Sequence, residues 1–315
     1  MNRYQLVILS EDANRYRQLL EKESLPGLSI VTACRVEGAE KTLGECDILF
    51  GTPDLVAKAL SYTTGRLQWV QSMWAGVTPL IAPSRGKQFV VTGVKSVFGH
   101  AIAEYVICYL LVCERNVIGR FCKQQQAQWD ESTPGTLDGK NIGIMGLGSI
   151  GGAIARTAKF FRMNVFGFSR GGTRPPEVDR HFLPHQLADF VKELDYLVCV
   201  LPDTPGTSNL IDRAIFRIMR DTALIVNVGR GNAIDEASLV EALETGEIAG
   251  AVLDVFCSEP LARSHPLWKT PNTFITSHTA AKSLPEDVAP VFIANYRRLI
   301  DGRTLLGIVD PDRGY

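Results

Sequence analysis

The chain has 315 residues, of which 45% are hydrophobic and 21% charged, and its formal net charge is −1. This length exceeds what one hydrophobic core usually serves, so we expect two domains. The near balance of charge creates no overall field for nucleic acid or an acidic membrane surface, so neither is expected as a partner.

The first hundred residues alternate short apolar segments with helical patterns, which predicts a parallel sheet covered by helices. The expected strands and helices are residues 6–9, 29–31, 48–50, 67–71 and 89–91 for strands, and 13–22 and 53–60 for helices. One long amphipathic to apolar helix is then expected from Gly99 to Gln126.

A second and more regular series begins at Lys140. Its six expected strands are residues 141–145, 164–168, 196–201, 223–228, 251–255 and 274–276. Six parallel strands complete a dinucleotide-binding sheet of the Rossmann type. A helix at 285–300 and a short tail follow, and we expect the tail to pack on the amino-terminal domain. The fold class is therefore α/β.

A glycine-rich turn, Gly146, Gly148 and Gly151 with Ser149 and Ile150 between them, closes the first strand of this series and opens a helix. In that context the glycines allow a tight turn, close approach of a pyrophosphate and close helix packing. The helix amino terminus adds free N–H groups for the phosphates. A ligand-free turn is the alternative, but the placement favours a cofactor.

The second strand ends at Ser169 and Arg170, with Arg174 nearby and no acid before Glu177. An NAD site usually has an acid here to hold the ribose hydroxyls. A hydroxyl and guanidinium groups suit a 2′-phosphate instead, so we expect NADP(H) to be preferred. NAD(H) stays possible if these arginines are only solvated.

Three polar residues follow the last three strands: Arg230, Glu259 and His278. Singly they could be a surface ion-pair partner, a helix cap and a hydrogen-bonded core histidine. Together they can grip a carboxylate, polarise the adjacent carbonyl and transfer a proton to its oxygen. They are the expected catalytic residues.

Several segments resemble the D-isomer-specific 2-hydroxyacid dehydrogenases in order and spacing. They are Leu201–Thr207, Asn227–Gly231, Leu253–Phe256 with Glu259–Leu261, and His278–Ala281. Within that family, the chain is similar to the glyoxylate/hydroxypyruvate reductase A subgroup at Ser169-Arg170, at Trp74–Val77, and at Val309-Asp310 with Arg313-Gly314-Tyr315.

The resemblance implies roles for individual residues. Arg230 would bind and polarise a 2-oxo acid, His278 would be the acid/base, and Glu259 would orient it. Asp254 would hold the nicotinamide carboxamide. The backbone of Ala75, Gly76 and Val77, beside Trp74, would cradle the substrate carboxylate. Further cofactor contacts are expected at Leu201, Pro202, Thr207, Val228, Gly229 and Ala280.

The resemblance also implies a division of the chain. Residues 99–283 would form a Rossmann cofactor domain, inserted into a flavodoxin-like substrate domain made of residues 1–98 and 284–315. Family members are usually homodimers, and helix 99–126 would lie in the interface. The chain departs from many relatives at two positions, with Thr78 for Asp or Asn and Ser277 for Pro. Neither departure removes a catalytic group, but Thr78 and the bulky Trp74 leave substrate choice open.

The expected activity is reduction of a small 2-oxo acid, such as glyoxylate or hydroxypyruvate, to the D-2-hydroxy acid with NADPH. One alternative is an NAD-linked dehydrogenase for a bulkier 2-oxo acid, with Trp74 lining an apolar pocket. Another is a dinucleotide-sensing protein of the corepressor type, but the chain has the complete catalytic set and no basic tract.

The seven cysteines are scattered and mostly lie in apolar runs, without a C-x-x-C pair. We therefore expect buried free thiols in a reducing compartment and no metal site. The apolar segment near the start, Leu6–Leu9, is too short for the core of a signal peptide. A cytoplasmic location is expected.

Overall fold

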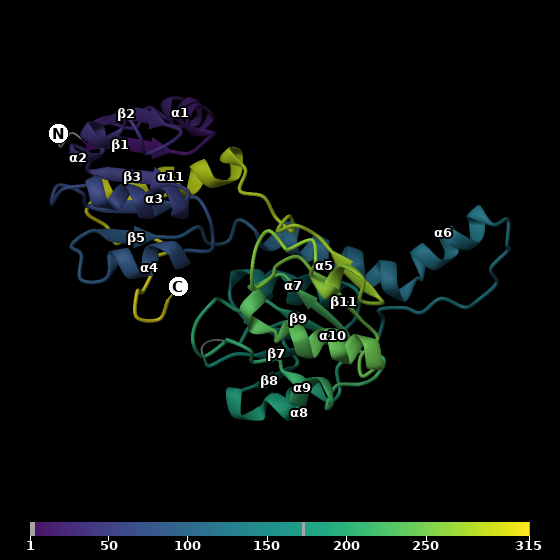
Figure 1. Cartoon of the computed structure of the whole chain (residues 1–315). Coiled ribbons are helices and arrows are strands. Elements are labelled where there is room, and N and C mark those ends of the chain that lie inside the picture. The colour runs from purple at the N-terminus through teal and green to yellow at the C-terminus, as the bar shows by residue number, and fades with distance from the viewer. Residues whose placement is uncertain (1–3, 172–173, 315) are drawn as a thin grey trace. The chain divides into compact units, whose positions relative to one another are not determined.

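The computed structural model describes residues 4–171 and 174–314 (Figure 1). The chain divides into two compact units, here called unit 1 (Met1–Val97 and Lys282–Tyr315) and unit 2 (Phe98–Ala281). Each unit has its own parallel sheet, which confirms the expected α/β class.

Unit 1 is built on a five-stranded sheet whose strands run in the order β2-β1-β3-β4-β5, all pairs parallel. This is the flavodoxin-like doubly wound order. Its elements are β1 Tyr4–Leu9, α1 Ala13–Glu21, β2 Leu28–Ala33, α2 Glu40–Gly44, β3 Ile48–Gly51, α3 Pro53–Ala59, the 3₁₀ turn Leu60–Tyr62, β4 Trp69–Ser72, α4 Thr78–Ser84, β5 Val90–Thr92 and α11 Pro285–Ile300.

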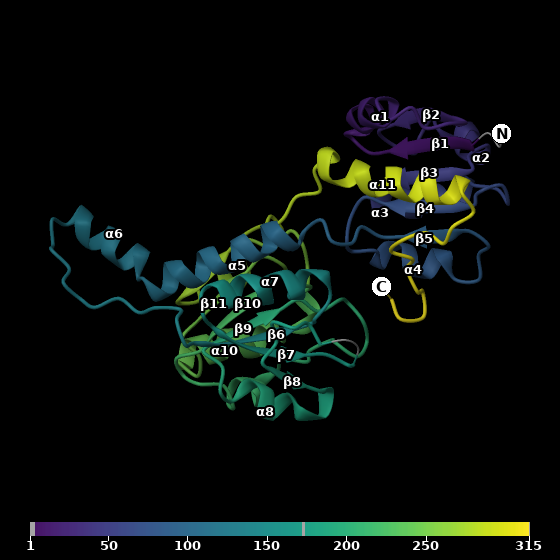
Figure 2. The ribbon, with the colours of Figure 1, turned by 180° about the vertical axis from the view of Figure 1, so that it is seen from behind.

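The carboxy-terminal segment packs into unit 1. Helix α11 lies along the sheet face seen in Figure 2, where the Phe292 ring stacks on those of Phe50 and Trp69 at 4.8 and 4.9 Å. The tail that follows this helix in the chain pairs with β5, where Val309 N–H donates to the Val91 carbonyl at 2.9 Å. These fully buried aromatic rings tie the last thirty or so residues of the chain to its first strands.

Unit 2 holds the second series of strands and the helices between them. Its elements are α5 Gly99–Glu114, α6 Val117–Gln125, β6 Asn141–Met145, α7 Ser149–Phe160, β7 Asn164–Phe168, β8 Arg180–Phe182, the 3₁₀ turn Pro184–Gln186, α8 Leu187–Val191, β9 Tyr196–Cys199, α9 Arg213–Phe216, β10 Leu224–Asn227, the 3₁₀ turn Gly231–Ala233, α10 Glu236–Thr245, β11 Gly250–Leu253, the 3₁₀ turn Pro266–Trp268 and β12 Thr273–Ile275.

The sheet of unit 2 has the order β12-β11-β10-β9-β6-β7-β8, again with parallel pairing. Within the described residues it therefore has seven strands, where the sequence predicted six. The additional strand, β8, is only three residues long and lies at the edge. Arg180 occupies it with its guanidinium 4.5 Å from the Phe166 ring centre, so no apolar run marked it in the sequence.

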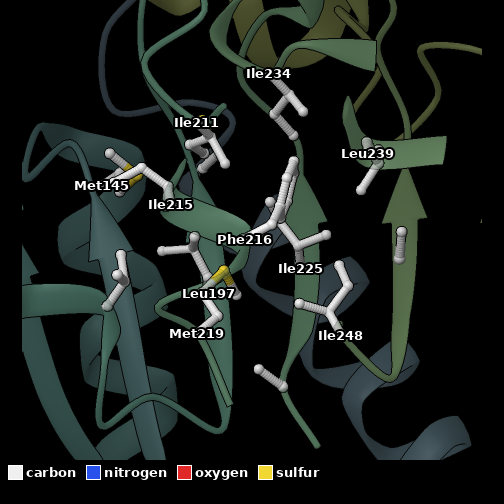
Figure 3. Close-up of a cluster of buried hydrophobic side chains, with 14 of the residues drawn as sticks. Met145, Leu197, Ile211, Ile215, Phe216, Met219, Ile225, Ile234, Leu239 and Ile248 are labelled. Atoms are coloured by element: carbon white, nitrogen blue, oxygen red, sulfur yellow. The ribbon is translucent and has the colours of Figure 1, made fainter. Parts of the chain in front are cut away.

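Helices cover both faces of this sheet. Figure 3 shows the apolar cluster on one face, in which Phe216 of α9 and Leu239 of α10 pack on Leu197 and Ile225 of the central strands. On the other face α7 packs against α5. Every labelled side chain of the cluster is at most 8% exposed, so the strands are held rigidly and their carboxyl ends provide a fixed platform.

The expectation of a single helix from Gly99 to Gln126 is wrong, because the structure has two helices in this segment. Helix α5 ends at Glu114, and α6 begins at Val117. Between them Asn116 has the left-handed backbone angle φ 48°, a conformation that asparagine tolerates and that ends a helix. Helix α6 extends away from the sheet of its unit in both views (Figures 1 and 2).

The expectation of mostly buried cysteines is also wrong. All seven are free, but only Cys46 and Cys199 are buried. The apolar runs that contain the others form helix faces and loops turned to solvent, as at Cys108 and Cys122. In the described part of the chain, none of the helices is long and apolar enough to cross a membrane.

Candidate active site

The carboxyl ends of parallel strands meet at one edge of a sheet, where open α/β folds bind ligands. In unit 2 this edge carries the glycine turn after β6 and Ser169 after β7. Arg230 follows β10, Asp254 follows β11 and His278 follows β12. The fold therefore assembles at one edge residues that are more than one hundred positions apart in the chain.

The glycine turn leaves room for a ligand on its outer side. Among the described residues, no atom comes within 4 Å of the place that a Cβ would take at Gly148. On the inner side the helix approaches closely, because a Cβ on Gly151 would lie 1.9 Å from the Gly146 carbonyl oxygen. Helix α7 begins at Ser149 with no acidic side chain in its first turn and no side-chain cap. Its free N–H groups fit a pyrophosphate.

Ser169 stands next to this turn, since Gly146 N–H donates to the Phe168 carbonyl at 2.9 Å. Ser169 is half-buried, whereas Arg170 and Arg174 are exposed. After β7 the chain therefore offers a neutral hydroxyl and two cationic side chains. These suit a ribose that carries a phosphate better than a ribose that carries only hydroxyls.

The Arg230 backbone is held both by its own loop and by the neighbouring segment at Phe256. A Cβ on Gly231 would lie 1.9 Å from the Phe256 carbonyl carbon, so only glycine lets the two segments approach. Buried Asn227 donates through Nδ2 to the Arg230 carbonyl at 3.1 Å and accepts from Gly229 N–H at 3.1 Å. Sequence reasoning gave Asn227 no role, although a polar residue at the end of a buried strand was a signal.

Burial lowers the pKa of the Arg230 guanidinium from its usual value, and the carboxylates of Glu259 and Asp203 oppose that shift. The guanidinium stays charged throughout the neutral range. Its Nη1 donates to the Gly229 carbonyl at 2.6 Å. A desolvated cation with these few partners is suited to binding an anionic ligand.

His278 and Glu259 form a hydrogen-bonded pair. The imidazole Nδ1 lies 2.8 Å from Glu259 Oε2, and Glu259 Oε1 accepts from Phe256 N–H at 2.9 Å. The side chains are 50% and 36% exposed. Because Glu259 is acceptor-only, the paired Nδ1 carries a proton, and Nε2 is left to exchange a proton with a ligand.

Asp254 fixes the segment that bears His278. The carboxylate is buried and accepts from Thr279 N–H at 2.8 Å and from Ala280 N–H at 3.0 Å, while His278 N–H donates to the Asp254 carbonyl at 2.8 Å. His278 itself has φ 56°, which a side chain with a Cβ adopts only when its surroundings enforce it. Asp254 is thus a positioning residue for His278.

A hydroxyl chain extends this support to helix α5. Tyr105 Oη lies 2.7 Å from Thr276 Oγ1, and Thr276 donates in turn to Asp254 Oδ1. Burial raises the pKa of Tyr105 above its usual value, so the phenol stays a donor at neutral pH. The order is therefore Tyr105 to Thr276 to Asp254. Sequence reasoning missed both hydroxyl residues, because their positions carry no motif.

The other expected cofactor positions lie in loops at the same edge. Leu201, Val228 and Ala280 are buried, and Pro202 is half-buried. Thr207 is buried, and its hydroxyl donates to the Pro202 carbonyl at 2.7 Å, which closes the loop after β9. The Leu201 backbone lies close to Gly229, because a Cβ on Gly229 would be only 2.7 Å from the Leu201 backbone nitrogen.

The expected substrate segment belongs to unit 1. Trp74 is 39% exposed. Its backbone N–H donates to Ser72 Oγ at 3.0 Å, and the Ser72 hydroxyl donates to the Trp74 carbonyl at 2.9 Å. Among the described residues, the N–H groups of Ala75, Gly76 and Val77 have no hydrogen-bond acceptor. Successive free N–H groups before a helix, here α4, suit an anion such as a carboxylate.

Comparisons with known proteins identify the family of the chain. The sequence profile for the NAD binding domain of the D-isomer specific 2-hydroxyacid dehydrogenases matches residues 107–280. The chain is 33% identical over 258 residues to glyoxylate/hydroxypyruvate reductase A of Serratia proteamaculans (strain 568), covering 80% of this chain and 82% of that protein.

Two solved structures are similar over nearly the whole chain. A D-isomer specific 2-hydroxyacid dehydrogenase family protein of Aeromonas salmonicida subsp. salmonicida A449 is 39% identical, with a TM-score of 0.92 and coverage of 99% of this chain and 100% of that one. A family member from Xanthobacter autotrophicus Py2, solved with NADPH and MES, is 29% identical, with a TM-score of 0.89 and the same coverage.

The profile covers more than half of the chain, and its domain contains the glycine turn, Arg230, the Glu259–His278 pair and Asp254. The chain therefore belongs to the D-isomer specific 2-hydroxyacid dehydrogenase family and is an oxidoreductase that uses a nicotinamide dinucleotide.

Proposed function

We propose that the protein reduces a small 2-oxo acid, such as glyoxylate or hydroxypyruvate, to the D-2-hydroxy acid with NADPH. The observation that carries the proposal is the Glu259–His278 pair, at the same sheet edge as the glycine turn and electrostatically coupled through Glu259 to Arg230. The similarity to glyoxylate/hydroxypyruvate reductase A supports this substrate class.

The residues divide the chemistry between them. Arg230 binds the substrate carboxylate and polarises the adjacent carbonyl. His278 donates the proton on Nε2 to the carbonyl oxygen, and Glu259 stabilises the ring in the protonated form. When bound, the reduced nicotinamide supplies the hydride that substrate C2 accepts. Arg230 and His278 together stabilise the negative charge that develops on the oxygen.

In this proposal the free N–H groups of Ala75, Gly76 and Val77 in unit 1 suit binding of a carboxylate. Trp74 beside them limits the size of the substrate side chain. Unit 1 is therefore the substrate domain, and unit 2 the cofactor domain.

The dinucleotide is held by the glycine turn and by the N–H groups at the start of α7, with the 2′-phosphate bound by Ser169, Arg170 and Arg174. The NADPH-bound relative supports this preference. Reversing the charge with Arg170→Asp removes a charge-assisted hydrogen bond worth ~1.5–3 kcal/mol and adds repulsion. The Kd for NADPH should then rise at least about tenfold, while the Kd for NADH should change little.

Fluorescence titration of both cofactors measures this difference. Arg17→Asp, on α1 of unit 1, makes the same change of net charge and serves as the control. Equal weakening of NADH and NADPH by Arg170→Asp, or equal turnover of the wild type with both cofactors, would contradict the NADPH preference.

Substrate choice is tested by a panel of glyoxylate, hydroxypyruvate, pyruvate and phenylpyruvate with NADPH and NADH. Highest kcat/KM for glyoxylate or hydroxypyruvate with NADPH supports the proposal. Highest kcat/KM for phenylpyruvate with NADH would support the alternative, an NAD-linked dehydrogenase for bulkier acids. If neither cofactor is consumed with any substrate, the result would support the other alternative, a dinucleotide-sensing protein.

The hydroxyl chain behind Asp254 gives a sharper test of the acid/base assignment. Thr276→Val keeps the shape of the side chain but removes the hydrogen bond to the carboxylate, so His278 is held less precisely. We expect kcat to fall about tenfold, equivalent to ~1.4 kcal/mol, with the KM for NADPH nearly unchanged. Steady-state kinetics should show recovery in Thr276→Ser; if serine and valine behave alike, the hydroxyl has no positioning role.

We also propose that the protein forms a homodimer through α5 and α6. Helix α6 projects from unit 2 (Figure 2), and its apolar residues Val117, Ile118 and Phe121 are 45%, 51% and 55% exposed. Such a contiguous apolar surface is unusual on a monomer.

We further propose a cytoplasmic location. The free cysteines support it, because thiols stay reduced in that compartment.

Phe121→Asp should convert the dimer into a monomer, because a carboxylate cannot be buried unpaired at the interface. Light scattering measures the mass in solution. Gln18→Asp, at an exposed position on α1 of unit 1, should leave the dimer intact. A monomeric wild type would rule out the dimer, and a dimeric Phe121→Asp variant would exclude this residue from its interface.

A further inference from the structure

His181 reaches the cofactor edge from the strand that the sequence did not predict. It lies in β8 in register with Gly167 of β7. Its Nε2 is 2.8 Å from Ser169 Oγ, and Ser169 N–H donates to the Phe182 carbonyl at 3.2 Å. Ser169, expected at the 2′-phosphate, is therefore held on β8 by two hydrogen bonds, one from its hydroxyl and one from its backbone N–H.

The direction of the bond between His181 and Ser169 decides what the hydroxyl presents to a ligand. A serine hydroxyl has one proton to donate and two lone pairs that accept. If His181 Nε2 carries a proton, it donates to Ser169 Oγ, and the serine proton points elsewhere. The other acceptor that the described residues offer is the Gly171 carbonyl at 3.3 Å, a long bond that a stronger acceptor can replace.

A phosphate is such an acceptor, and unlike a ribose hydroxyl it cannot donate when fully ionised. It needs donors only, so it gains from a serine whose proton is kept available. The 2′-hydroxyl of NADH can donate as well as accept, so it bonds Ser169 in either orientation. An effect on hydroxyl orientation therefore distinguishes the two cofactors.

We propose that His181 is a specificity-determining residue for NADPH, a positioning residue that acts through Ser169. This inference rests on the proposed use of NADPH. Arg170 and Arg174 are exposed and supply charge. In this proposal the His181 ring carries its proton on Nε2, so that the half-buried Ser169 is held as a donor before the cofactor binds. Such preorganisation increases affinity, because less rotamer freedom is lost on binding.

A purely structural role for this bond, joining β7 to β8, makes a different prediction. Its loss would then weaken NADPH and NADH equally and lower the melting temperature. The selectivity between the two cofactors is therefore the informative quantity.

The variants His181→Asn and His181→Gln provide a matched pair. Glutamine places an amide N–H near the position of Nε2, and asparagine is too short to reach Ser169. The Kd values for NADPH, NADH, 2′,5′-ADP and 5′-AMP are measured by isothermal titration, and melting temperatures are recorded for each variant. Neither substitution introduces a charge, and both keep a polar side chain at this half-buried position.

We expect His181→Asn to weaken NADPH and 2′,5′-ADP about three- to tenfold, because Ser169 must then be ordered when the cofactor binds. NADH and 5′-AMP should change less than twofold, and His181→Gln should recover most of the loss. In Ser169→Ala, the further change of His181→Asn should have no additional effect, because the pair acts as one unit.

Equal losses for both cofactors, or no loss for NADPH, would overturn the role of His181 while leaving the proposed function intact. A wild type that binds NADH and 5′-AMP as tightly as NADPH and 2′,5′-ADP would overturn both the NADPH preference and this inference.

Discussion

His278→Ala should lower kcat for 2-oxo acid reduction about 10²–10⁴-fold, which is ~3–5.5 kcal/mol of barrier. The variant loses the proton donor at the carbonyl oxygen, while the glycine turn and Ser169 remain. The Kd for NADPH should therefore stay close to that of the wild type. Stopped-flow measurement of NADPH consumption separates the chemical step from binding.

Glu259→Gln provides a second measurement on the same pair. Glutamine keeps an acceptor for Nδ1 but removes the carboxylate that orients the ring and stabilises it during proton transfer. Reduction of the 2-oxo acid should slow, with a smaller loss than in His278→Ala, and the Kd for NADPH should stay close to that of the wild type. Near-normal turnover of His278→Ala would exclude His278 as the acid/base.

Arg230→Lys should raise the KM for the 2-oxo acid and lower kcat, for a combined loss in kcat/KM of about 10–150-fold, equivalent to ~1.5–3 kcal/mol. Lysine keeps the charge but loses the planar fork that can bind a carboxylate and reach the adjacent carbonyl at once. It also loses the Nη1 bond to the Gly229 carbonyl that aims the side chain.

The control for Arg230→Lys is cofactor affinity, because Arg230 has no assigned contact with the adenosine end of the dinucleotide. The Kd for NADPH should be unchanged within twofold. A lysine variant with wild-type kcat/KM would mean that a point charge suffices, and the bidentate role would be rejected.

Much of this architecture was predictable because the signals were local. The glycine turn follows an apolar strand and opens a helix, so spacing alone placed the cofactor cradle. Arg230, Glu259 and His278 each follow a strand, and parallel strands bring their carboxyl ends together. Pattern therefore placed these residues at one edge without any knowledge of their contacts.

What the sequence did not predict depends on contacts between distant segments. Strand β8 is short and carries Arg180, so its pairing with β7 left no apolar signal. The break at Asn116 is one left-handed residue inside an otherwise helical pattern. Asp254 binds the backbone of Thr279 and Ala280, 25 and 26 positions further along the chain. The hydroxyl chain joins Tyr105 to Thr276 across 171 positions.

The most direct test of the central claim is a crystal structure of the protein with NADP and oxamate, a 2-oxo acid analogue that cannot be reduced. The account predicts the oxamate carboxylate on the Arg230 guanidinium and its amide oxygen hydrogen-bonded to His278 Nε2, with Glu259 still on Nδ1. Oxamate bound away from Arg230, or a His278 ring turned from it, would contradict the account.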